Sequence, residues 1–159
     1  MSLKTQIAKW VFLSCAKHFE DNINSLTTFV EGGQERDLSG QTSWAEIRID
    51  GPDLREVSKE IYIIQSEINI LVATHFSPLA PSNHVINVGK AIAAFTDFYI
   101  YKYGADSEDT GASLEVFRLE PLDDNRERIQ VANMGQIDPA IKLLQTTIEG
   151  HYRMVFENN

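Results

Sequence analysis

Disulfide chemistry and membrane insertion are the first possibilities that this sequence excludes, because it has almost no cysteine and no long apolar run. The single cysteine, Cys15, can form no internal disulfide, so no oxidising compartment is implied. No stretch approaches the roughly 20 apolar residues that a membrane span needs. The apolar block at 10–13 is too short for a secretory signal. We therefore expect a protein with no membrane segment that remains in the cytoplasm where it is made.

Positive charge is also scarce. The chain has 14 Lys plus Arg against 23 Asp plus Glu, which gives a formal net charge of -9. Nucleic acid binding depends on neutralising phosphates with basic side chains. A surface with this balance repels phosphate, so a protein that reads DNA or RNA is disfavoured.

Recognisable catalytic and metal-binding patterns are missing as well. The histidines are dispersed along the chain, without zinc-ligand spacing, at His18, His75, His84 and His151. Gly32-Gly33 lacks the rest of a phosphate-binding loop, and no Gly-x-Ser-x-Gly elbow occurs. Cys15 reads as a buried, inert thiol. We accordingly predict no enzyme activity, no cofactor and no metal site.

Two groups of polar residues could form a metal site or a catalytic site, but a simpler interpretation is favoured for each. Asp106, Glu108 and Asp109 lie in a loop where they could chelate calcium, yet they lack the calcium-loop pattern, and a solvated hairpin tip is favoured. His151 lies between Glu149 and Arg153 on the polar face of a strand. It is interpreted as a surface or interface residue rather than a catalytic one.

The most informative stretch that is present runs from Ser43 to Thr74 and predicts a β-hairpin. Its first strand, Trp44–Asp50, alternates apolar and polar residues and is expected to end at Gly51-Pro52-Asp53. The second strand, Glu60–Thr74, would be about 50 Å long at roughly 3.3 Å per residue. Its core face comprises Tyr62, Ile64, Ser66, Ile68, Ile70 and Val72, whereas Gln65, Glu67 and Asn69 occupy the middle of the other face. A strand of this length either bends through a bulge or projects past the core.

The remaining elements predict an α+β fold in a single domain, 1–159. An amphipathic helix spans Leu3–Asn22 with Ser2 as its N-cap, and a second helix runs from Ser82 or Asn83 to about Thr96. The second helix carries an apolar stripe of Val85, Val88, Ile92 and Phe95. Further strands are expected at 27–31, 98–103, 112–119, 128–132 and 144–156. Because helices and strands do not alternate regularly, the sheet should be mainly antiparallel, with a long projecting β-hairpin packed by the two helices.

The order of these elements resembles the tail-terminator (tail-completion) proteins of long-tailed bacteriophages. The matching features span nearly the whole chain: the helix Leu3–Asn22, the strands Ser43–Asp50 and Glu60–Thr74, the helix after Asn83, the strand Phe98–Gly104 and the last strand through Gln145–Tyr152. No single piece is specific. The resemblance rests on their order, on the chain length and on the acidic balance.

This resemblance implies a virion protein that forms a ring of six identical subunits on the tail tube, ends tube growth and meets the head connector. DNA would pass through the ring without specific binding. Strands at sheet edges would extend the sheet across subunits. The implied interface residues are Trp44, Arg48, Gln65, Glu67, Asn69, His151 and Arg153, and the channel-lining candidates are Asp106, Glu108 and Asp109. Glu67 is a further channel candidate.

Three alternatives remain open at this point. A head-completion or neck adaptor, or a tail-tube component, would differ mainly in its neighbours. A metal-dependent domain or enzyme would use the acidic loop at 106–109. A small-molecule-binding module would be lined by Tyr99, Tyr101 and Tyr103, which share one face of their strand.

Overall fold

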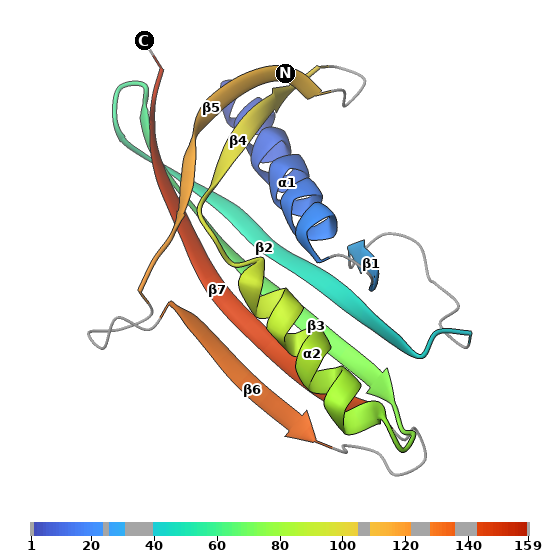
Figure 1. Cartoon of the computed structure of the whole chain (residues 1–159). Coiled ribbons are helices and arrows are strands. Elements are labelled where there is room, and N and C mark those ends of the chain that lie inside the picture. The colour runs from blue at the N-terminus through green and yellow to red at the C-terminus, as the bar shows by residue number, and fades with distance from the viewer. Residues whose placement is uncertain are drawn as a thin grey trace.

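A curled sheet with both helices on one of its faces makes up the fold (Figure 1). The computed structural model describes residues 2–23, 26–30, 40–104, 109–121, 128–135 and 143–158, excluding the side chains of residues 109 and 133–135. In chain order the elements are α1 (Leu3–Asn22), β1 (Thr27–Val30), β2 (Ser43–Ser58), β3 (Ile61–His75), α2 (Ala80–Ala93), β4 (Phe98–Tyr103), β5 (Asp109–Leu119), β6 (Ile129–Gly135) and β7 (Leu143–Glu157).

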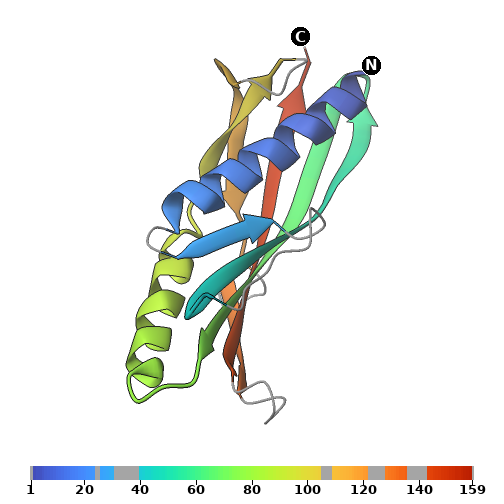
Figure 2. The same cartoon turned by 90° about the vertical axis from the view of Figure 1, so that its right-hand side faces the viewer.

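The sheet has seven strands in the order β1-β2-β3-β7-β5-β4, and β6 also pairs with β7. Only the β1–β2 pair is parallel among the strand pairs of the described residues. The predicted α+β class with a mainly antiparallel sheet is therefore confirmed. In Figure 2, α2 lies to one side of the strands and α1 crosses in front of them, and both helices contribute to one buried core with the sheet.

Helix α1 has the predicted bounds and the predicted N-cap. The Ser2 hydroxyl accepts a hydrogen bond from the Thr5 amide at 3.3 Å, which satisfies one of the free donors of the first turn. Its buried side chains are spaced three or four residues apart, at Ile7, Val11, Ser14, Cys15 and Phe19. This spacing places them in one stripe that packs on the core face of the sheet. Cys15 is buried, as predicted, and burial raises the pKa of its thiol.

Three side chains of α1 also bind the backbone of β4 and its end. The Trp10 indole nitrogen donates to the Tyr103 carbonyl at 2.9 Å, and the Lys9 ammonium donates to the Gly104 carbonyl at 2.9 Å. The Ser14 hydroxyl accepts from the Tyr101 amide at 2.9 Å. These bonds fix α1 against the part of the sheet that curls over it.

The long hairpin is present, but the end predicted for its first strand is wrong. Strand β2 does not stop at Gly51-Pro52-Asp53 and continues to Ser58, so the expected charged connection is itself strand. The pairing shifts from Asp50 opposite Glu67 to Asp53 opposite Gln65, which is a β-bulge. Gly51 makes the bulge possible because its φ of +98° is unfavourable for residues with a side chain.

Strand β3 confirms the predicted alternation. All six residues of its predicted core face, Tyr62 to Val72 at even positions, are buried. The strand is paired over its whole length on one side with β7, from Ile61 opposite Glu157 to His75 opposite Leu143. Strand β7 alternates in step with it, so that the two strands share a buried face and a polar face.

An aromatic cluster fills the core between the sheet and the helices. The ring of Tyr152 lies 5.1 Å from Phe98 and 5.4 Å from Phe117, centroid to centroid. The Tyr152 hydroxyl donates to the Thr96 carbonyl at 2.9 Å. The neighbouring Phe95 ring lies directly over Gly150, where an added Cβ would come within 2.6 Å of Phe95 Cδ1. Gly150 is thus the space into which the Phe95 ring packs.

Helix α2 is shifted relative to its prediction, and the predicted apolar stripe is partly wrong. The helix spans Ala80–Ala93, and Val85 is 71% exposed. The buried face instead includes His84 and Asn87. The two ring nitrogens of His84 each lie 2.8 Å from a threonine hydroxyl, that of Thr74 on β3 and that of Thr146 on β7. Because these hydroxyls provide hydrogen bonds inside the protein, His84 faces inward beside Ala80 and Ala91, whereas Val85 and Ile86 face outward.

Two further boundaries differ from expectation. Strand β5 begins at Asp109 rather than Ala112, so part of the predicted hairpin tip is strand. Strand β6 extends to Gly135 rather than ending at 132. Neither shift alters the sheet order.

The substitution Gly150→Ala should destabilise the protein by about 1–3 kcal/mol, because the new methyl group overpacks against Phe95. The matched control is Gly89→Ala, at an exposed position of α2, where nothing lies within 4 Å of the added Cβ. This control should instead stabilise the protein by about 0.5–1 kcal/mol. Urea unfolding followed by circular dichroism measures both. Equal effects of the two substitutions would contradict the proposed packing.

The stability of the protein should fall as the pH drops below about 6.5, the ordinary pKa of histidine. Burial lowers the pKa of His84, and burial also lowers that of His18. The unfolded chain therefore takes up protons more readily, and stability that is complete above pH 6.5 is lost towards the lower folded pKa. Urea unfolding at pH 7.5 and 5.5 should show a smaller difference for His84→Gln than for the unsubstituted protein. An unchanged difference would rule out His84 as a source of the effect.

Candidate functional site: the uncovered face of the long sheet

The face of β2, β3 and β7 that points away from the helices carries a row of polar side chains. Register places Arg48, Asn69, Glu149 and Gln130 side by side across four strands, and the next row contains Asp50, Glu67 and His151. Along each strand these residues alternate with the buried core residues. The period of the strands therefore collects them on one surface, which we call the outer face.

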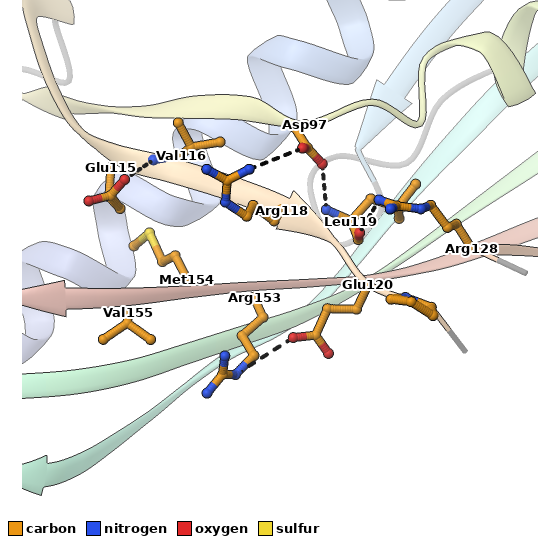
Figure 3. A pocket seen from close by; sticks show the side chains of 11 residues that line it. Asp97, Glu115, Val116, Arg118, Leu119, Glu120, Arg128, Arg153, Met154 and Val155 are labelled. Carbon is orange, nitrogen blue, oxygen red and sulfur yellow. Dashed lines mark hydrogen bonds and ion pairs between the residues drawn. The ribbon is translucent and has the colours of Figure 1, made fainter. Parts of the chain in front are cut away.

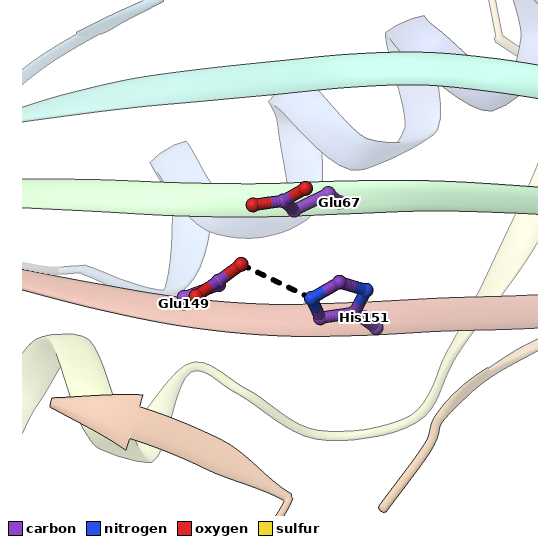
Figure 4. Close-up of side chains that lie close together, drawn as sticks. All are labelled: Glu67, Glu149 and His151. Carbon is purple, nitrogen blue, oxygen red and sulfur yellow. Dashed lines mark hydrogen bonds and ion pairs between the residues drawn. The ribbon is translucent and has the colours of Figure 1, made fainter. Parts of the chain in front are cut away.

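Three side chains in the middle of the outer face lie close together (Figure 4). One carboxylate oxygen of Glu67, one of Glu149 and one ring nitrogen of His151 all lie within 4.8 Å of one another. His151 Nε2 is 3.1 Å from Glu149 Oε1. The Asn69 amide donates to Glu67 Oε1 at 3.2 Å. We call Glu67, Glu149 and His151 the outer-face triad.

The two carboxyl groups of the triad have pKa values shifted in opposite directions. A hydrogen bond between the Glu67 and Glu149 side chains is the main cause of both shifts, raising the pKa of Glu67 and lowering that of Glu149. A bond to His151 lowers the pKa of Glu149 further. The two carboxyl groups therefore influence each other's ionisation, and Glu149 ionises more readily than Glu67.

A hollow of about 420 Å³ adjoins the triad where the β2 bulge widens the sheet. Its lining includes four acidic residues, Asp50, Asp53, Glu67 and Glu120, together with His151. Ser66 also lines it, is 5% exposed, and its hydroxyl has no hydrogen-bond partner among the described residues. The hollow is therefore acidic, whereas the Ser66 side chain belongs to the core face of β3.

The two ends of the outer face are more apolar than its middle. At one end, Trp44 packs with Ala73, Leu143 and Phe29. At the other end, Ile61 and Ile63 are half-buried, and Val155 opposite Ile63 is exposed. Interfaces bury apolar area at their centre and keep charge at the rim, so the end with the exposed Val155 is the part of this face best suited to contact another protein.

A second hollow, of about 500 Å³, contains three arginines but offers little free positive charge (Figure 3). Arg118 Nη1 is 3.7 Å from Asp97 Oδ2, and Arg153 Nε is 3.6 Å from Glu120 Oε1. Arg128 Nη1 donates to the Leu119 carbonyl at 2.9 Å. Each guanidinium already has a partner, so the arginines do not form an anion-binding site. We interpret the hollow as a gap at the junction of β5 and β7.

A third hollow, of about 380 Å³, lies between β4 and α1. It is lined by Tyr99, Tyr101 and Tyr103 and by polar residues of the helix, including Lys17 and Asp21. The structure therefore places the three tyrosines of the small-molecule hypothesis along one hollow. The rings of Tyr99 and Tyr101 are tilted by 50° at 6.4 Å.

The sequence-based interface candidates fall mostly on the outer face. Gln65 is exposed, Arg153 binds Glu120, and Arg48 lies 3.5 Å from Glu46. Glu67, Asn69 and His151 belong to the triad or contact it. Trp44 differs from the others because it is buried: only 8% of it is accessible, and it packs within its own chain. It offers little surface to a partner.

The channel-lining candidates have a different outcome. Asp106 and Glu108 lie outside the described residues, and Asp109 begins β5 but its side chain is not described. Their role stays a prediction. The same applies to a calcium site formed by these three residues.

Sequence reasoning missed Asp50, Glu120 and Ser66 as parts of the acidic hollow. Asp50 carried a signal, since the strand pattern placed it on the polar face. Glu120 and Ser66 carried none, because their proximity depends on the β2 bulge and on the β5–β7 pairing, in which the Glu120 amide donates to the His151 carbonyl at 2.8 Å.

The sheet edges differ in character. The outer part of β2, beyond its four-residue pairing with β1, carries Pro52 and the charged residues Arg55 and Glu56. Proline and charge protect an edge from pairing with another strand. Strand β6 pairs only with β7 within the described ranges, and its sequence, IQVANMG, contains neither charge nor proline. It is an edge without these protective features.

Comparison with known proteins assigns no family. No protein-family model matches the chain, and no curated protein matches it in sequence. In the described part of the chain, neither helix is long and apolar enough to span a membrane.

Proposed function

We propose that this chain is a structural protein of a bacteriophage virion that assembles into a ring at the head-proximal end of the tail tube. In this role it ends tube growth and joins the tail to the head connector. It acts as an assembly component and not as an enzyme. The resemblance in element order, chain length and charge supports this identity, and the geometry of the sheet supports the proposed mode of association.

The observation that carries the proposal is the uncovered outer face of β2, β3 and β7. Both helices pack on the opposite face, so within the described residues no helix covers the outer side of these three long strands (Figure 1). Interfaces bury apolar area at their centre, so the end of the face with Ile61, Ile63 and the exposed Val155 is the part proposed to make closest contact. A second copy of this chain is the proposed occupant.

Strand β6 supports association through the sheet edge as well. An unprotected edge strand can pair with a strand of a neighbouring subunit, and main-chain hydrogen bonds then provide affinity. The edges of this sheet are different strands, β4 and β6 on one side and β1 with the outer part of β2 on the other. Contact between unlike edges is heterologous, and such contacts close into a ring when the rotation between neighbouring subunits allows closure. Six subunits are proposed for this ring.

The acidic surplus suits the passage of DNA. A channel wall that repels phosphate allows DNA to slide without being held, because basic side chains would be needed to bind it. Asp106, Glu108 and Asp109 are proposed to contribute to that wall. The tail-tube protein and the head connector are the proposed partners, in the virion, after synthesis in the host cytoplasm.

A head-completion protein, neck adaptor or tube component is the nearest alternative. These proteins share the ring geometry and differ in which end of the ring contacts which neighbour. Binding to isolated tail tubes, compared with binding to isolated heads, distinguishes them.

Assembly is tested by light scattering and electron microscopy of the purified chain, alone and with tail tubes of the same phage. The expected particle has about six times the 18.0 kDa mass of the chain, or forms when tubes are added and caps one end of each. A chain that remains monomeric at all concentrations and never joins tubes would refute the proposal.

The substitutions Glu67→Lys and Asn69→Lys should leave the fold intact but weaken assembly, because they place a positive charge in the centre of the outer face. Glu20→Lys, on the exposed side of α1, is the matched charge-reversal control and should assemble normally. Mass by light scattering reports assembly, and the urea midpoint reports monomer stability. Damage to stability as large as the damage to assembly would show that the outer face serves the fold of the single chain.

A further inference from the structure

The outer-face triad combines three groups that are good ligands for metal ions. Two carboxylates and an imidazole converge from two paired strands, with their nearest ligand atoms within 4.8 Å of one another (Figure 4). None of the local sequence motifs for zinc predicts it, because Glu67 lies 82 residues before Glu149 and 84 residues before His151. The three residues meet only through the β3–β7 register.

We propose that Glu67, Glu149 and His151 bind a divalent transition-metal ion of the zinc type. Carboxylate oxygen and imidazole nitrogen are both ligands that Zn²⁺ accepts, and three protein ligands leave a position open for water. A second copy of the chain is not required, because all three ligands come from one sheet. The proposal is therefore independent of the ring function.

The backbone holds the ligands in a favourable arrangement. His151 is the cross-strand partner of Glu67, and Glu149 is two residues before it on the same face of β7. Two ligands bound to one tetrahedral zinc ion lie roughly 3.4 Å apart. His151 Nε2 and Glu149 Oε1 are already 3.1 Å apart. Small rotations of half-exposed side chains suffice to bring Glu67 to the same ion.

Neighbouring residues supply the surroundings of a metal site. The Asn69 amide binds Glu67 Oε1 at 3.2 Å and orients that carboxylate, as outer partners of metal ligands commonly do. Asp50 lies opposite Glu67 and adds negative charge. The nearby arginines, Arg48 and Arg153, are each directed to another carboxylate, Glu46 and Glu120 respectively. A divalent cation would balance the two carboxylates of the triad.

The acidic hollow beside the triad leaves room for a water ligand. It opens next to Glu67 and His151 and has a volume of about 420 Å³, enough for water at the open metal position.

Isothermal titration calorimetry of chelator-treated protein with Zn²⁺ tests the proposal. One ion should bind per chain, and both His151→Gln and Glu149→Gln should abolish binding in the measurable range. Asn69→Ala should weaken it by about 10- to 100-fold, as loss of an outer partner does. His75→Gln removes an imidazole far from the triad along β3 and should leave binding unchanged.

Ca²⁺ and Mg²⁺ provide the selectivity arm of the experiment. Both ions prefer oxygen ligands, so they should bind at least tenfold more weakly than Zn²⁺. Circular dichroism confirms that each variant is folded before titration. Absence of Zn²⁺ binding, or binding that persists unchanged in His151→Gln and Glu149→Gln, would overturn the site. Either result would leave the test of ring assembly unaffected, since that test measures particle mass without added metal.

Discussion

The pairing of β3 with β2 on one side and β7 on the other is the constraint on which the rest of the structure depends. These pairs hold three long strands in step over most of their length. Side chains of a strand alternate between two faces, so a register shift of one residue would exchange the buried and exposed sets. The fixed register therefore determines which residues form the core beneath the helices and which form the outer face.

The core side shows how strongly that register is specified. Gly150 must lie under Phe95, because any larger residue at that position would collide with the ring. Thr74 and Thr146 must point towards α2, because His84 binds both hydroxyls. These contacts come from β3, β7 and α2 together. A slip of either strand would remove the space for Phe95 and the hydrogen bonds of His84 at the same time.

Much of the fold could be predicted from local sequence patterns. The alternation in β3 and β7 and the cap and stripe of α1 each reflect interactions within a few residues, and the structure confirms them. The end of β2 could not be predicted in this way. Gly51-Pro52 is usually a strand terminator, but here the glycine accommodates a bulge that only the partner strand β3 defines. The inward face of α2 could not be predicted from the sequence either, because His84 becomes a core residue only when two threonines from distant strands bind it.

The candidate site could likewise be predicted only in part. Single residues of the outer face, such as Glu67 and His151, could be assigned to a polar surface from strand alternation alone. Their convergence with Glu149 could not, because it depends on the register of two strands separated in the chain by a helix and three further strands. The acidic hollow is still less visible in the sequence, since it combines the β2 bulge with Glu120 from the end of β5.

The composition of the outer face explains how one surface can serve assembly without a strongly apolar centre. Burying a carboxylate is costly unless it is paired, so the triad opposes any interface that would simply dehydrate it. The apolar side chains at the Ile63 and Val155 end can provide affinity, whereas the charged centre restricts which arrangement of subunits is tolerated. A cation held by the triad would remove much of that cost, because its charge would remain balanced when water is excluded. The proposed metal binding and the proposed association would thus be linked through one electrostatic term, the cost of covering the charge of the triad.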